Sequence, residues 1–149
     1  MTVYRLHRHI RQPHEYNLNA EYRWNPARTP MLYSAAALSL CCLEVLVHTD
    51  VDLIPENMVW SWAELPVDPG PMEYVRDISN IEQTRALGKR WIEERRSLSI
   101  QVPSIIVPLT RIDFNILLNP LHDDYGNLQW QRGGRFVFDP RLFRDEPLV

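Results

Sequence analysis

The sequence predicts a single α/β (α+β) domain, in which a mixed β-sheet core surrounds a buried central helix. Apolar segments with strand-like patterning alternate with two segments of helical patterning along the chain. The 149 residues, 45% of them hydrophobic, are enough for one substantial core. The prolines are scattered as turn signals, and no internal repeat is visible. We therefore expect one compact domain spanning residues 1–149.

In the first half, three strands flank one helix. Residues 3–9 predict the first strand and residues 31–33 a short buried one. Residues 35–48 are apolar almost all round, rich in Ala and Leu and free of Gly and Pro, which predicts a central helix covered on most sides. Alternation over residues 58–62 predicts a third strand, and the proline cluster over 66–71 predicts a long loop.

The second half begins with an amphipathic helix. Ser79 and Glu82 have the spacing of a capping box, and Ile81, Leu87, Trp91 and Ile92 form one apolar stripe, so we expect a surface helix ending near Arg96. The β-branched or alternating segments 100–108, 115–118 and 135–138 predict further strands separated by turns.

Composition limits the function classes. A formal net charge of −3 provides no field that would attract nucleic acid or an anionic membrane, so we expect neither as a direct partner. Cys41 and Cys42 are adjacent in an apolar run, where a mutual disulfide would strain the backbone, so buried free thiols are expected. The longest apolar run is interrupted by polar residues, and the basic N-terminus has no signal-peptide pattern. We expect a cytoplasmic protein.

Glu44 is the most informative single residue, because it is the only carboxylate between Glu21 and Asp50 and lies in the apolar helix. Burying a carboxylate without a partner is costly. One interpretation is a structural ion pair with Arg23 or Arg28. The other is a catalytic acid whose negative charge faces a cationic transition state.

Other polar residues give weaker signals. Arg23 lies in a turn-forming stretch and could offer donors to a phosphate, with Trp24 beside it lining a pocket. Ser104 needs a hydrogen-bond partner in an apolar segment. His7, His9 and His14 lack acidic or cysteine companions, so no metal site is expected, and His122 is interpreted as structural. No Rossmann or P-loop motif is present.

Taken in order, seven motifs resemble the RES family, which is named for its Arg, Glu and Ser. They are Arg23-Trp24-Asn25, Thr29-Pro30-Met31-Leu32-Tyr33-Ser34, Leu43-Glu44-Val45-Leu46-Val47-His48, Gly88-Lys89-Arg90-Trp91, Val102-Pro103-Ser104, Asn119-Pro120-Leu121-His122 and Phe138-Asp139-Pro140-Arg141. The ordered set runs through nearly the whole chain and is far more specific than any one motif.

This resemblance implies a toxin of a bacterial toxin–antitoxin pair, with a fold similar to NAD-dependent ADP-ribosyltransferases. The implied reaction cleaves the nicotinamide–ribose bond of NAD+, which is a substrate, and needs no metal. Family members differ in whether water, phosphate or a protein accepts the ADP-ribose. The implied partner is an antitoxin of the Xre type that covers the active-site cleft, in complexes often assembled from dimers.

The resemblance also implies residue roles. Arg23 would hold a phosphate of NAD+, Tyr33 would pack on the nicotinamide end, Glu44 would stabilise the ribosyl cation, and Ser104 would hydrogen-bond the nicotinamide side. Trp24 would line the same site. Cleavage of the glycosidic bond leaves positive charge on the ribose, so a fixed carboxylate would lower the barrier.

The sequence departs from the family at three positions. Two glycines usually precede the arginine, where Glu21 and Tyr22 stand here, and Arg28 replaces a third glycine ahead of Thr29. An acid and a bulky ring could crowd or repel a phosphate, whereas Arg28 could add a second phosphate contact. Three functions follow: an enzyme that degrades free NAD+, a protein mono-ADP-ribosyltransferase, and a catalytically weakened fold that acts as a binding partner.

Overall fold

A computed structural model describes residues 1–50, 52–72, 77–107 and 113–143 of this chain. Seven strands form one sheet in the order β4-β5-β6-β2-β1-β3-β7. The strands are β1 (Thr2–Arg8), β2 (Leu32–Ala35), β3 (Met58–Glu64), β4 (Gly70–Pro71), β5 (Ser99–Pro103), β6 (Phe114–Leu118) and β7 (Gln131–Phe136). The helices are α1 (Leu38–Val47) and α2 (Ile81–Glu94), with the 3₁₀ turns η1 (Tyr125–Asn127) and η2 (Pro140–Phe143). The predicted α/β class is confirmed.

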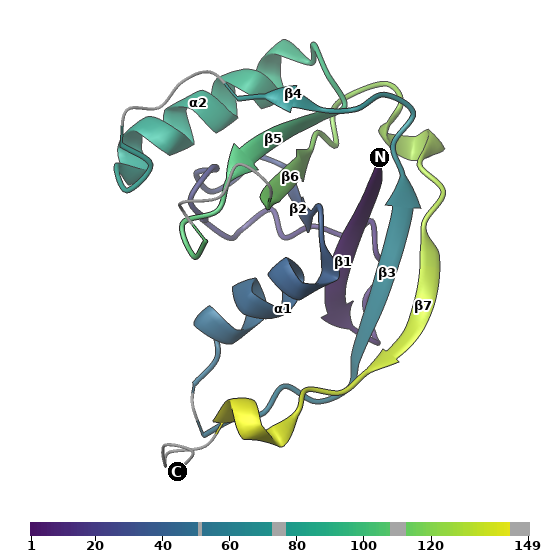
Figure 1. Ribbon diagram of the computed structural model, residues 1–149. Helices are drawn as coiled ribbons and strands as arrows, with labels where there is room; N and C mark the ends of the chain where they lie inside the picture. The colour runs from purple at the N-terminus through teal and green to yellow at the C-terminus, as the bar shows by residue number, and fades with distance from the viewer. Residues whose placement is uncertain (51, 73–76, 108–112, 144–149) are drawn as a thin grey trace.

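The sheet is mixed, because β4 runs parallel to β5 whereas the other neighbouring pairs are antiparallel. Strands β1 and β2 share a single register pair, Tyr4 with Ala35. This one pair joins strands β4-β5-β6-β2 to strands β1-β3-β7. In Figure 1 the sheet curves around α1, which lies beside β1 and β2 at this junction. Helix α1 packs against both of these strands, so it covers that junction.

Both helices lie on one face of the sheet. Successive side chains of a strand point to opposite faces. On β6, Leu117 packs with Trp91 and Ile92 of α2, whereas Leu118 belongs to a separate cluster that Trp130 and the segment around η1 cover. On β2, Ala35 packs with Leu40 of α1. The helix-bearing face therefore carries Asn115, the residue two positions before Leu117.

The expected elements are present, with shifted ends. The predicted loop over 66–71 contains the two-residue strand β4, and the strand predicted over 135–138 begins earlier, at Gln131. The predicted capping box is wrong: Asn80, not Ser79, caps α2 by accepting a hydrogen bond from the Gln83 amide at 3.0 Å. The Ser79 hydroxyl instead donates to Asp77. Among the described residues, no helix has the length and apolar character to cross a membrane.

Helix α1 is less buried than the sequence predicts. Leu40 and Cys41 are its buried residues, while Leu43 is 40% and Val47 59% exposed. The helix packs on β1 and β2 with one side only, and the apolar residues on its other side reach the surface. The expected free thiols are present, with Cys41 buried and Cys42 half-buried.

Candidate active site

Helix α1 carries Glu44 to the edge of the area that it buries. Glu44 follows Leu40 by four positions and Cys41 by three, so it lies on the same side of the helix as these two buried residues. Its side chain is half-buried. The helix therefore aims a carboxylate towards the helix-bearing face of the sheet.

Two neutral donors converge on one oxygen of that carboxylate. The Asn115 amide donates to Glu44 Oε1 at 2.6 Å, and the Ser104 hydroxyl donates to the same atom at 3.3 Å. Asn115 lies on β6, and Ser104 directly follows β5, the neighbouring strand. Neither Arg23 nor Arg28 forms the ion pair with Glu44 that the sequence left open, among the contacts of the described residues.

Ser104 is 1% exposed, and its hydroxyl is fully used. The Ile106 and Val107 amides donate to Ser104 Oγ at 3.1 and 3.4 Å. With both acceptor positions occupied, the hydroxyl proton is left for Glu44. The hydrogen-bond partner that Ser104 was predicted to need is present, and the hydroxyl forms three hydrogen bonds in all.

Tyr33 is held in place through its hydroxyl. It donates to Asn25 Oδ1 at 2.8 Å and accepts from the Trp24 amide at 3.1 Å. Burial raises the pKa of Tyr33 above its ordinary value; the hydrogen bond from the Trp24 amide and the positive charge of Arg85 oppose this rise, whereas Tyr22 and, least of all, Glu44 add to it. The phenol therefore stays neutral. Its two hydrogen bonds hold the loop that precedes β2 in place.

Arg23 is attached to the start of α2. Its Nη1 donates to the Ile78 carbonyl at 2.8 Å, and the Thr84 hydroxyl donates to the Arg23 carbonyl. No contact joins Arg23 to Glu44 among the described residues. Its Nε and Nη2 donors have no partner in the described part of the chain, so they are available to a ligand.

The other predicted binding residues are placed differently. Trp24 is 2% exposed and packs with Met31, Trp91 and Ile92, so its indole belongs to the core rather than to a pocket wall. Arg28 is exposed, and its φ of 65° lies in the left-handed region that favours glycine.

Two of the three residues at positions where the family resemblance leads us to expect glycine have partners of their own. Glu21 pairs with Arg85, whose Nη1 lies 3.6 Å from Glu21 Oε2. The Tyr22 ring stands edge-on to the Tyr33 ring, with centroids 5.4 Å apart and an interplanar angle of 68°. Glu21 is thus partly neutralised by a neighbouring cation, and Tyr22 extends the aromatic surface that begins at Tyr33.

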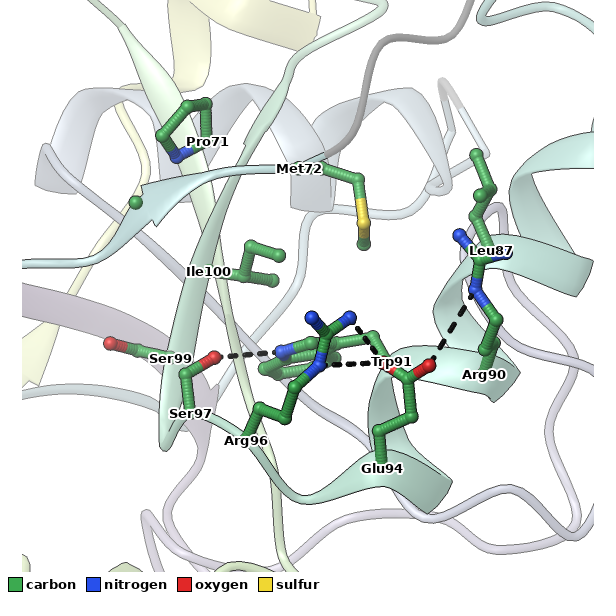
Figure 2. A pocket seen from close by; sticks show the side chains of 11 residues that line it. Pro71, Met72, Leu87, Arg90, Trp91, Glu94, Arg96, Ser97, Ser99 and Ile100 are labelled. Atoms are coloured by element: carbon green, nitrogen blue, oxygen red, sulfur yellow. Dashed lines mark hydrogen bonds and ion pairs between the residues drawn. The ribbon is translucent and has the colours of Figure 1, made fainter.

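Cavity volume does not locate this site. One cavity of about 280 Å³ lies between α2 and strands β4 and β5 (Figure 2), where Trp91 Nε1 donates to Ser97 Oγ at 2.8 Å. Another, of about 720 Å³, is lined by residues of β3 and the segment around η1. Neither is lined by Arg23, Tyr33, Glu44 or Ser104. The convergence of donors on Glu44 is what distinguishes the candidate site.

Histidines do not assemble a metal site in the described ranges. No group of three or more His, Cys, Asp or Glu side chains has a metal-binding arrangement there. His7 is buried, with Nε2 2.8 Å from Ser61 Oγ and Nδ1 3.0 Å from the Arg8 carbonyl. His122 accepts from the Asp124 amide at 3.2 Å, which agrees with its interpretation as structural.

Asn115 is a residue of the site that the sequence analysis does not predict. A signal was available, because Asn115 interrupts the apolar strand 114–118 at a position that shares a face with Leu117. An amide in such a strand needs a partner. The sequence does not say that the partner is Glu44, 71 positions away.

The fold and the site define an α/β domain that holds a half-buried carboxylate by neutral donors, an arrangement suited to stabilising a nearby positive charge. The RES domain profile matches residues 2–139, so the chain belongs to the RES domain family.

Three relatives resemble most of the chain. A Sphingobium protein named Prs ADP-ribosylating toxin is 28% identical over 132 residues, which are 82% of this chain and 80% of the relative. A Photorhabdus laumondii protein named Toxin Res is 34% identical over 69% of each chain. A Pseudomonas putida protein of the same name is 33% identical over 85% of this chain and 88% of the relative.

Proposed function

We propose that this chain is a toxin that cleaves the bond between nicotinamide and ribose in NAD+. Its membership of the RES family and relatives named as toxins support this function. The observation that carries it is the state of Glu44, whose carboxylate is held by two neutral donors and pairs with no cation among the described residues. Its negative charge is therefore available to a ligand.

The proposed reaction uses that charge directly. The C1′–N bond breaks, its electron pair leaves with neutral nicotinamide, and positive charge develops on the ribose. Glu44 stabilises this cation through preorganised electrostatics, as carboxylates do in glycoside hydrolysis. An acceptor then attacks C1′ and loses a proton, giving ADP-ribosyl-acceptor, nicotinamide and H+.

Substrate positioning is assigned to the loop that precedes β2. Arg23 uses one nitrogen on the Ile78 carbonyl, and its remaining donors would bind a phosphate of NAD+. Tyr33, fixed by Asn25 and the Trp24 amide, would pack on the nicotinamide end. Exposed Arg28 would add a second phosphate contact. The similarity in fold to ADP-ribosyltransferases is part of the same proposal, and it comes from the family resemblance.

Protein mono-ADP-ribosylation is the second candidate. The relative named Prs ADP-ribosylating toxin favours it. The two reactions share bond cleavage at C1′ and differ only in the acceptor. An antitoxin partner and action in the cytoplasm are part of either proposal, whereas a catalytically weakened fold would retain the partner alone.

The test follows nicotinamide release and NAD+ loss with purified protein, with and without phosphate. Glu44→Gln removes the charge and keeps the shape, and should lower the rate roughly 100- to 1,000-fold. Glu93→Gln, an exposed acid on α2, is the matched control and should retain activity.

The products identify the acceptor. Water gives ADP-ribose and phosphate gives a phosphorylated ADP-ribose. Transfer to a protein is detected with NAD+ labelled in its ADP-ribose part, as label retained on protein when a cell extract is added. Failure of the wild type to consume NAD+ under all three conditions would exclude both enzymatic proposals and favour the binding-only fold.

A further inference from the structure

We propose that Asn115 is a positioning residue, which acts together with Ser104 to fix the orientation of the Glu44 carboxylate. Both donors bind the same atom, Glu44 Oε1, at 2.6 Å and 3.3 Å. No described residue donates to Oε2. The arrangement leaves Oε2 as the oxygen that faces the ribosyl cation. This inference rests on the proposed function and assigns the way in which its central residue is oriented.

The direction of each hydrogen bond follows from chemistry. An ionised carboxylate can only accept, so Asn115 must turn its amide nitrogen towards Glu44. The Ser104 oxygen already accepts from the Ile106 and Val107 amides, so its proton is the one atom that it can offer. Both donors are neutral, so they orient the carboxylate without cancelling its charge.

Asn115 lies on a strand that is paired on both sides, which makes its backbone rigid. Its backbone lies within β6 and is in register with Val102 of β5 on one side and with Ala35 of β2 on the other. Glu44, by contrast, lies at the edge of the buried side of a ten-residue helix, and its long, half-buried side chain has more rotatable bonds to fix. A side chain on a paired strand is the more fixed of the two, so Asn115 sets the position and Glu44 follows it.

This arrangement revises the role that family resemblance gives to Ser104. A hydroxyl with both acceptor positions and its proton engaged has no remaining bond for a nicotinamide amide. We assign Ser104 to holding Glu44 and the turn after β5.

Activity measurements give the first test. Asn115→Ala should lower kcat roughly 10- to 100-fold and leave KM for NAD+ within about threefold, because the lost interaction orients the transition-state charge rather than the ground-state substrate. Asn115→Leu keeps the volume without the donor and should behave the same way. Ile116→Val, the neighbouring β6 residue on the opposite face, is the control for a loosened strand and should retain kcat.

A double-mutant cycle separates positioning from an independent contribution. In a Glu44→Ala background, Asn115→Ala should cause no further loss, because nothing is left to orient. Retention of kcat within about twofold in Asn115→Ala, or additive losses in the double variant, would overturn the proposal.

A second readout needs no turnover, so it separates this inference from the proposed function. The Asn115 side-chain NH₂ signals in a ¹⁵N–¹H correlation spectrum should be shifted by the short bond to the carboxylate and should move towards ordinary amide positions in Glu44→Ala. Unchanged Asn115 signals in that variant would refute the positioning role. If the shift is seen but the wild type consumes no NAD+, the proposed function fails and the positioning contact stands.

Discussion

Arg28 occupies a backbone conformation that its own side chain disfavours. Its φ of 65° lies in the left-handed region, where a Cβ atom costs about 1–2 kcal/mol. Its amide donates to the Leu18 carbonyl at 2.8 Å, which holds the loop in this conformation. The glycine that the family resemblance leads us to expect here would adopt this conformation without strain, whereas we expect arginine to adopt it at a cost in stability.

Arg28→Gly should raise the free energy of unfolding by about 0.5–1 kcal/mol, since relief of the left-handed strain exceeds the extra entropy that glycine brings to the unfolded chain. Chemical denaturation measures this change. If Arg28 also binds a phosphate, the same variant should raise KM for NAD+. Unchanged KM would refute the phosphate contact, and lower stability would refute the strain argument.

Helix α2 is the element that organises the loop carrying Arg23. The Thr84 hydroxyl binds the Arg23 carbonyl, and Gly88, one turn later, lets the helix approach the Trp24 backbone. A Cβ atom on Gly88 would lie 1.7 Å from the Trp24 carbonyl oxygen. Helix packing against this loop therefore depends on the absence of a side chain.

Gly88→Ala should lower the free energy of unfolding by about 1–3 kcal/mol, as overpacking does. Helix propensity alone favours alanine by about 1 kcal/mol, so the sign of the change shows which effect is larger. Gly126→Ala, where an added Cβ would meet no atom within 4 Å, is the control and should have little effect. A stabilising Gly88→Ala would contradict the close approach.

At the scale of the whole molecule, buried His7 links folding to pH. Burial lowers the pKa of His7; the neighbouring cations Arg5 and Arg132 lower it further, while the Arg8 carbonyl opposes this. Because the folded-state pKa lies below the unfolded value of about 6.5, the unfolded chain binds the proton first as the pH falls. The contribution of His7 to stability is therefore complete above about pH 6.5 and is lost as the pH falls towards the lowered pKa.

His7→Asn should remove part of the decrease in stability that we expect of the wild type as the pH falls below about 6.5, a part with a slope of at most about 1.4 kcal/mol per pH unit. Denaturation curves across this range measure it. His9→Asn, an exposed change on the same segment, is the control and should leave the slope as in the wild type. An equal slope in His7→Asn would show that other groups cause the pH dependence.

The sequence by itself determined the α/β class, the order of most elements and the family, because hydrophobic periodicity and ordered motifs are local properties of the chain. It also singled out Glu44, since one acid in an apolar helix is visible without a structure. The proposed roles of Arg23 and Tyr33 remain predictions from resemblance.

Only the tertiary structure decided what Glu44 touches. Its partners Ser104 and Asn115 lie 60 and 71 positions away, and strand pairing between β5 and β6 brings them together. The shift of the helix cap to Asn80, the one-sided burial of α1 and the packing of Trp24 in the core were decided in the same way. Each depends on which surfaces meet, and a linear pattern specifies which residues are apolar but not which distant residues they will face.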